Sequence, residues 1–347
     1  MRILSHDDVD AALAGRERAV LDAVRAAYVL HEQGQSQIPF SSFLRPPVRP
    51  GSRIISLPAY LGGPEPVMGL KWISSFPENT GRGLQRAASV CILNDLETGY
   101  PTALLEGSQI SAARTAASAA LASGLLQGGR SVRSVGIVGC GTINHRVVKF
   151  LTVVHPEIET VVLQDVVGAH AEISAAQLAA EYPGIAFRAG DLADALGADT
   201  VSIATTDSSH WLNLADYPAR PAGQVILHLS LRDLSTSSIL DAYNMVDDTD
   251  HAVREETSLH HAERAVGHRG FVHAEIGRLL TEQTRPWAGA PAVVFSPFGL
   301  GILDLAVCAA VLKAATETGL GTRFDGFEPG SHRVTSRRVG DLAGSVA

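Results

Sequence analysis

The chain has 347 residues, of which 46% are hydrophobic and 18% charged, and its formal net charge at pH 7 is −8. This composition predicts a globular protein of one large or two medium domains, and the excess of acidic residues argues against nucleic acid or an anionic membrane as the main partner. A polar N-terminus at residues 5–8, no apolar run long enough for a membrane span, and three cysteines without metal-ligand spacing predict a cytoplasmic protein with reduced thiols and no metal site.

The first part of the chain changes from a helical to a β-type pattern. Residues 5–34 are expected to form one helix, because Ser5 can cap it and apolar residues recur at helical spacing. Short β-type runs between proline or glycine turns follow over 38–106, with a hairpin loop at Asp95–Gly99, and predict an antiparallel or mixed sheet. Residues 107–127 are rich in alanine and serine, and we expect a helix that packs closely on a neighbour.

Residues 132–165 have the pattern of a dinucleotide-binding unit: strand, tight turn, helix and strand. Gly139 permits the turn, Gly141 lets the backbone approach a pyrophosphate, and the helix N-terminus supplies free N–H groups and a positive dipole. Asn144 stands where a third glycine is usual. Asp165 lies at a strand end, where a carboxylate meets an adenosine ribose diol and repels a 2′-phosphate, so NAD is predicted over NADP.

Strands and helices alternate from 131 to 297, which predicts a doubly wound parallel sheet with helices on both faces. Further strands are expected at 200–205, 225–230, 244–248 and 292–297, with helical stretches to about 283. An apolar helix follows at 299–319, and we expect it to return to the first domain. The fold class is therefore α/β, with an N-terminal α/β domain, a Rossmann-type domain and a disordered tail, at 1–128 (completed by 299–325), 129–298 and 326–347.

Two cations and one acid stand out as candidates for chemistry. Lys71 and Arg114 lie in runs that are otherwise apolar or small, and a buried cation needs an anion. That anion is either a substrate carboxylate or one of the chain's own carboxylates. Asp233 directly follows the 225–230 strand, at the edge where ligands bind in doubly wound sheets, and is a candidate general acid/base; the alternative is a cap for the next helix.

Other polar residues follow strands or begin helices. Thr205 and Thr206 follow a strand and can approach the cofactor, and Thr142 can cap the helix at the pyrophosphate. Asp304 is an acid within the apolar first half of the C-terminal helix, and it is either structural or faces the cofactor. The roles of three further residues stay open: Arg53, His145 and His210.

The residues resemble the ornithine cyclodeaminase/μ-crystallin family over roughly 4–325. The matching pieces are LPAY at 57–60, GLKW at 69–72, the NDLETGYP hairpin, EGSQISAARTAASAA at 106–120, GCGTIN at 139–144 and the strand-end Asp233. The resemblance implies an N-terminal α/β domain that binds substrate and forms a homodimer through its sheet, and a Rossmann domain that binds NAD(P).

Roles for particular residues also follow from the resemblance. It implies that Arg45, Lys71 and Arg114 hold the substrate α-carboxylate, that Thr115 lies near the pyrophosphate, and that Asp233 is the catalytic carboxylate. Lys71 is expected to orient the carboxylate and relay a proton. The remaining cofactor-binding residues expected are Gly139, Gly141, Thr142, Ile143, Asn144, Asp165, Thr205, Thr206, Ser230 and Gly301.

The resemblance also distinguishes branches of the family. Ornithine cyclodeaminases carry an acidic residue just before a Met-Pro pair, whereas this chain reads Ile54-Ile55-Ser56-Leu57-Pro58. The strings SSFLRPP, KWISSFP, LNDLETGYP, HLSLRDL and SPFGLGILDLA are more similar to the 2,3-diaminopropionate-forming branch, known from staphyloferrin B siderophore biosynthesis. That similarity implies a substrate with several carboxylates, N-(2-amino-2-carboxyethyl)-L-glutamate. It would be oxidised with NAD to 2-oxoglutarate and L-2,3-diaminopropionate, for a siderophore or an antibiotic.

Alternative functions remain at this point. Within enzymes they are an ornithine or lysine cyclodeaminase, an alanine dehydrogenase or a ketimine reductase. Outside enzymes the alternative is a non-catalytic, μ-crystallin-like binding protein.

Overall fold

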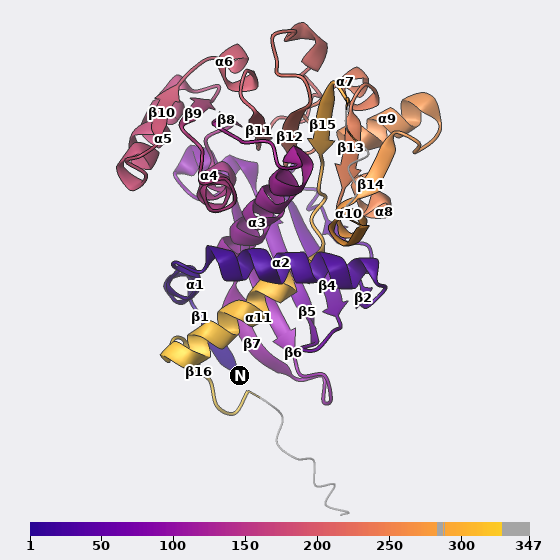
Figure 1. Ribbon diagram of the computed structural model, residues 1–347. Coiled ribbons are helices and arrows are strands. Elements are labelled where there is room, and N and C mark those ends of the chain that lie inside the picture. Colours follow the sequence, from indigo (N-terminus) through magenta and orange to yellow (C-terminus); the bar gives the residue numbers. More distant parts are fainter. Residues whose placement is uncertain (283–286, 288, 328–347) are drawn as a thin grey trace, which may run out of the picture.

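The computed structural model describes residues 1–282, 287 and 289–327. These residues form two sheets of eight strands each, which lie one above the other in Figure 1. The α/β fold class is thereby confirmed. The expected disordered tail lies outside the described residues from residue 328 onward.

The first sheet is mixed, as its short β-type runs predict. Its strand order is β16-β1-β7-β6-β5-β4-β2, and β3 also pairs with β4. Strands β4 to β7 form an antiparallel meander, whereas β1 runs parallel to β7. The strands are β1 (Arg2–Leu4), β2 (Ser36–Gln37), β3 (Ser42–Leu44), β4 (Arg53–Leu61), β5 (Val67–Ser75), β6 (Ala87–Asn94), β7 (Pro101–Glu106) and β16 (Thr322–Arg323). A short 3-10 helix, η1 (Pro77–Arg82), joins β5 to β6.

The prediction of one N-terminal helix is wrong, because the chain forms two. Ser5 caps α1 (His6–Leu13) through a capping box with Asp8, as expected. The helix then ends at Ala14, and Gly15 adopts a φ of +69°, which reverses the chain before α2 (Glu17–Glu32). Apolar spacing at helical period continues across this break, so periodicity alone does not reveal it.

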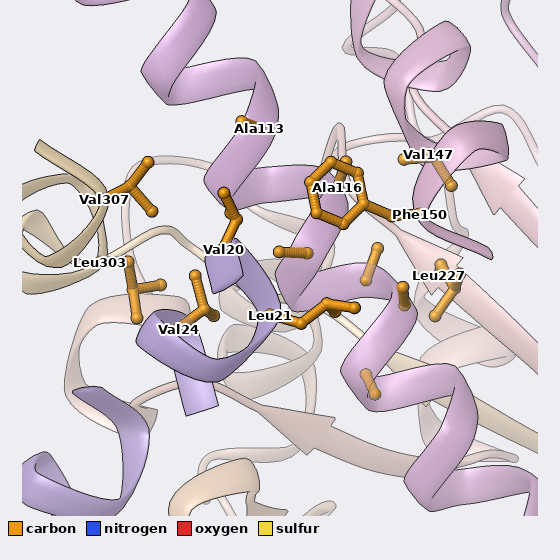
Figure 2. Packing of buried hydrophobic residues seen from close by; sticks show 14 of the residues in the cluster. Val20, Leu21, Val24, Ala113, Ala116, Val147, Phe150, Leu227, Leu303 and Val307 are labelled. Carbon is orange, nitrogen blue, oxygen red and sulfur yellow. The ribbon is translucent and has the colours of Figure 1, made fainter. Parts of the chain in front are cut away.

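Three long helices, α2, α3 and α11, contribute side chains to the apolar core between the two sheets. α3 (Ser108–Gln127) and α11 (Gly301–Thr318) form as predicted. α11 returns to the first sheet, where it packs on α2, β4 and β5 (Figure 1). Figure 2 shows Val24 of α2, Ala116 of α3 and Leu303 of α11 together with residues of the second sheet's layer, in one continuous apolar cluster.

The second sheet is entirely parallel, with the order β10-β9-β8-β11-β12-β15-β13-β14. Its strands are β8 (Ser134–Val138), β9 (Thr160–Gln164), β10 (Ala186–Ala189), β11 (Thr200–Ile203), β12 (Gln224–His228), β13 (Tyr243–Val246), β14 (Val272–Glu275) and β15 (Ala292–Phe295). Its helices are α4 (Thr142–Val154), α5 (Gly168–Glu181), α6 (Leu192–Leu196), η2 (Leu214–Asp216), α7 (Thr236–Leu240), α8 (Thr249–Ala252), α9 (Ser258–Val266) and α10 (Ile276–Glu282). The order reverses between β8 and β11, which creates a crevice at the carboxyl ends of these strands.

Strand β14 lies within a stretch expected to be helical. Its four residues, VHAE, are too few and too polar to show a strand pattern, and they become a strand by pairing with β13. Within the described residues, no helix is both long and apolar enough to span a membrane.

Candidate functional site

The turn between β8 and α4 forms one wall of the crevice. Gly139 has a φ of +89°, and a Cβ there would meet the carbonyl oxygen of Ala204, just after β11. Gly141 is the N-cap of α4 in an extended conformation and offers no capping side chain, so the first N–H groups of the helix stay open. The prediction that Thr142 caps this helix is therefore wrong: Thr142 is the first helical residue, because the cap position falls on Gly141.

Asn144 and Asp165 both bind this turn. Asn144 is buried, and its Nδ2 donates to the carbonyl oxygens of Val138 and Gly139 at 2.9 and 2.7 Å. The residue at the third-glycine position thus braces the turn with its own side chain. Asp165 directly follows β9, and its Oδ2 accepts a hydrogen bond from the backbone N of Cys140 at 2.8 Å. A carboxylate beside an open helix N-terminus fits the ribose and pyrophosphate of NAD.

Asp233 is fully buried in the loop that follows β12. The hydroxyls of Thr205 and Ser230 donate to its two carboxylate oxygens. Leu231 has a φ of +68°, which is rare for a branched side chain, and the chain bends at this residue. The capping alternative is excluded, because Ser235 caps α7 by accepting from the backbone N of Ser238.

His228 supports Asp233 from the end of β12. Its Nε2 lies 3.3 Å from Asp233 Oδ2, its Nδ1 lies 3.1 Å from Ser296 Oγ, and its side chain is fully buried. Burial by itself raises the pKa of Asp233, but hydrogen bonds and charge from His228, together with the hydroxyls of Ser230 and Thr205, outweigh burial and hold that pKa below 3.8. The carboxylate is therefore ionised at neutral pH and can accept a proton.

Lys71 and Arg114 come together around Asp304. Lys71 Nζ lies 2.7 Å from Asp304 Oδ2 and Arg114 Nε lies 3.0 Å from Oδ1, with Lys71 and Asp304 both buried. The internal ion pair, one of the two alternatives for these cations, is thus present, and Asp304 has a structural role. Two cations share one carboxylate, however, so one positive charge is left to attract a ligand carboxylate. Burial and the charge of Arg114 lower the pKa of Lys71 below 10.5, although Asp304 opposes them.

A single loop joins these two clusters. Ser296, at its start, contacts His228, and Gly299 lies so close to Arg114 that a Cβ would meet the guanidinium at 2.5 Å. Buried Asp247 anchors the loop by accepting hydrogen bonds from the backbone N of Phe298 and of Gly299 at 2.9 and 2.6 Å. Neither His228 nor Asp247 was among the predicted residues, although a histidine at the end of the apolar strand QVILH was a usable signal.

The other predicted residues have varied positions. Arg45 does not join Lys71 and Arg114: its guanidinium pairs with Glu255 at 2.7 Å, because strand β3 carries it to the sheet edge. Gly301 packs against β4, where a Cβ would lie 3.1 Å from Ala59 Cβ. Two of the remaining residues bind backbone carbonyls: Thr115 Oγ1 donates to Ser111 O at 2.7 Å, and Ser230 Oγ donates to Ile203 O. Ile143 is partly buried in α4, and Thr206 is exposed.

Comparison with known proteins identifies the family. The ornithine cyclodeaminase/mu-crystallin family model matches residues 3–319. The chain belongs to this family. Members similar to it in sequence include the N-((2S)-2-amino-2-carboxyethyl)-L-glutamate dehydrogenase of Staphylococcus aureus, which is 26% identical over 94% of this chain and 98% of its own length. Alanine dehydrogenase of Archaeoglobus fulgidus is 33% identical over 40% of this chain and 41% of its own.

Solved structures of the family agree with the fold. The Delta(1)-pyrroline-2-carboxylate reductase of Thermococcus litoralis, in complex with NADH and L-proline, superposes with a TM-score of 0.84 at 23% identity, covering 93% of this chain and 100% of that chain. An archaeal alanine dehydrogenase dimer with bound NAD has a TM-score of 0.82 at 24% identity, covering 94% and 99%.

Proposed function

We propose that this protein is an NAD-dependent oxidoreductase that cleaves N-(2-amino-2-carboxyethyl)-L-glutamate to L-2,3-diaminopropionate and 2-oxoglutarate. The observation that carries the proposal is the ionised, buried Asp233 beside the crevice, together with the spare positive charge of Lys71 and Arg114. The full-length similarity to a dehydrogenase of that substrate supports the choice of reaction. The product would serve siderophore or antibiotic biosynthesis.

The residues that would hold NAD are those of the β8–α4 turn and its neighbours. The open N–H groups of α4 suit the pyrophosphate, and Asp165 suits the adenosine ribose. When bound there, NAD would supply an acceptor for the hydride of the glutamyl Cα.

Lys71 and Arg114 would bind the α-carboxylate and so orient the carbon that is oxidised. Loss of the hydride from this carbon, and of a proton from the adjacent nitrogen to solvent water, leaves an imine. Water adds to the imine carbon while Asp233 accepts its proton, and the adduct then breaks at the carbon–nitrogen bond to release the two products. The Lys71 ammonium, whose pKa is lowered, would return a proton to the leaving nitrogen.

We further infer that the first sheet with α11 (1–128 and 299–325) binds substrate and mediates a homodimer, while 129–298 binds the cofactor. Support comes from the face of the first sheet opposite Lys71. There Trp72 and Val90, which pair across β5 and β6, are 41% and 37% exposed. Paired apolar side chains on an open sheet face suit a partner subunit.

The test is NAD reduction with synthetic N-(2-amino-2-carboxyethyl)-L-glutamate, followed by nicotinamide absorbance, with 2-oxoglutarate measured separately. L-Alanine and L-ornithine are assayed in parallel, and proline and ammonia are quantified because cyclodeamination makes no net NADH. Asp233→Asn is expected to lower kcat by about 10²- to 10⁴-fold while NADH affinity is retained. The exposed Asp22→Asn variant is the control.

Three results would contradict the proposal. Full turnover by Asp233→Asn would remove the catalytic role of this carboxylate. Proline formation from ornithine without NAD reduction would favour a cyclodeaminase. Binding of NADH without turnover of any substrate would favour a non-catalytic binding protein.

A further inference from the structure

Four arginines from separate segments lie together beside the loop that carries Asp233: Arg45, Arg53, Arg86 and Arg232. Arg86 Nη1 donates to Ser75 Oγ at 2.9 Å, and Ser75 lies opposite Arg53 in the β4–β5 register. Arg45 and Arg232 both bind Glu255, through its carboxylate at 2.7 Å and its carbonyl oxygen at 2.6 Å. Leu44 pairs with Ile54 across β3 and β4, so Arg45 and Arg53 follow and precede neighbouring register positions. Burial and the charges of the other three arginines lower the pKa of Arg53.

The carboxylates near these arginines already have partners, and Arg45 is the member of the cluster that pairs with one of them. Glu255 pairs with Arg45, Glu256 pairs with Arg264, and Asp233 accepts from Thr205 and Ser230. Within the part of the chain that the structure describes, three of the arginines form no ion pair, although each is partly buried: Arg53, Arg86 and Arg232. Partly buried guanidinium groups without a counter-ion are costly unless an anion joins them.

The cluster shares one face of the first sheet with Lys71. Arg53 lies four residues before Leu57 on β4, and Leu57 is opposite Lys71, so all three side chains point to the same side. Along β4, four residues separate the Cα positions of Arg53 and Leu57 by about 13 Å. Ser89, on the same face, lies between them, opposite Ile73.

Two buried polar atoms on this face point to a ligand. Among the described residues, neither Arg53 Nε nor Ser89 Oγ has a hydrogen-bond partner. Buried donors of this kind are normally satisfied. Both lie on the side of the sheet that faces the substrate-binding cations.

We propose that Arg53, Arg86 and Arg232 form a second carboxylate subsite, which takes the γ-carboxylate of the glutamyl half of the substrate. The proposal rests on the proposed function and adds a specificity determinant to it. Arg232 precedes Asp233 in the chain, so the subsite adjoins the carboxylate that acts on the glutamyl carbon. Arg45, which pairs with Glu255, lies at the exposed edge of the cluster.

The first test compares N-(2-amino-2-carboxyethyl)-L-glutamate with the analogue in which the γ-carboxylate is an amide. Arg53→Gln and Arg232→Gln are each expected to lower kcat/KM for the carboxylate substrate by about 10- to 100-fold, and to change that for the amide by less than about threefold. Arg53→Lys, which keeps the charge, restores part of the loss. Arg133→Gln is the matched control, because Arg133 is exposed and pairs with Glu159.

Unchanged kcat/KM in the arginine variants would overturn the subsite. Equal losses of kcat/KM with both substrates in folded variants would also overturn it. Neither result would contradict the proposed oxidation. A second test needs no turnover. Calorimetric titration of the NADH-bound protein is expected to show tighter binding of 2-oxoglutarate than of 2-oxobutanoate, and this preference disappears in Arg53→Gln. If no substrate reduces NAD, the proposed function fails, and equal binding of the two acids then also overturns the subsite.

Discussion

Asp233 depends for its charge on the side chains that surround it. A carboxylate removed from water is normally harder to ionise, and here three side chains reverse that tendency: Thr205, Ser230 and His228. His228 differs from the two hydroxyls because it is itself held from the other side by Ser296. We therefore expect His228 to be a positioning residue for Asp233, the proposed catalytic carboxylate.

Replacement of His228 by asparagine is expected to raise the pKa of Asp233, because burial then meets less opposition. Since the folded-state pKa of this carboxylate is depressed, activity is present above that pKa and is lost as the pH falls through it. In His228→Asn the acidic limb of the kcat/KM profile should move to higher pH. Ser296→Ala, which leaves the contact with Asp233 intact, should move it less. An acidic limb that stays in place in His228→Asn would rule out this role.

Asp165 is expected to set the preference for NAD. Its carboxylate lies against the glycine turn, where a 2′-phosphate would meet like charge. Asp165→Ser should reduce the ratio of kcat/KM for NAD to that for NADP by about tenfold or more, since like-charge juxtaposition costs several kcal/mol. Asp194→Asn, an exposed acid on α6, is the control. An unchanged ratio would show that another residue discriminates.

Helices, strands and turns whose conformation depends on nearby residues could be predicted from the sequence. The Asp95 hairpin forms because Asp95 Oδ1 accepts from the backbone N of Thr98 at 2.8 Å, a contact within four residues. The break between α1 and α2 and the strand β14 were not predictable in this way. The break at Gly15 is hidden by apolar residues that keep helical spacing on both sides of it, and β14 needs β13 beside it.

The two glycines of the β8–α4 turn are expected to have different roles: Gly139 in the stability of the fold and Gly141 in cofactor binding. Gly139→Ala is expected to lower the free energy of unfolding by about 1–3 kcal/mol, because a positive φ is strained for alanine and the Cβ meets Ala204. Gly141 has an ordinary φ and open space around its Cβ position. Gly141→Ala should keep the thermal midpoint and weaken NADH binding. Tight NADH binding by Gly141→Ala would place the pyrophosphate elsewhere.

At the scale of the whole molecule, we expect the open face of the first sheet to form the proposed dimer contact. Trp72→Glu is expected to convert a dimer into a monomer, because a charge placed opposite Val90 cannot be buried without a partner. Size-exclusion chromatography with light scattering measures this. Val166→Glu, at a residue that is 97% exposed, should leave the dimer intact. A wild-type protein that is monomeric at micromolar concentration would contradict the dimer.

The sequence by itself determined the parallel sheet, its glycine turn, the acid at the end of β9 and the three residues Lys71, Arg114 and Asp233. These follow from local periodicity, from the conformational needs of glycine and from the placement of charge at strand ends. Only the tertiary structure decided which groups share a site. Asp304 meets Lys71, and His228 meets Ser296, across more than sixty residues of chain, and Arg53, Arg86 and Arg232 gather from three segments. Such contacts depend on how helices and sheets pack, and no local pattern in the chain records them.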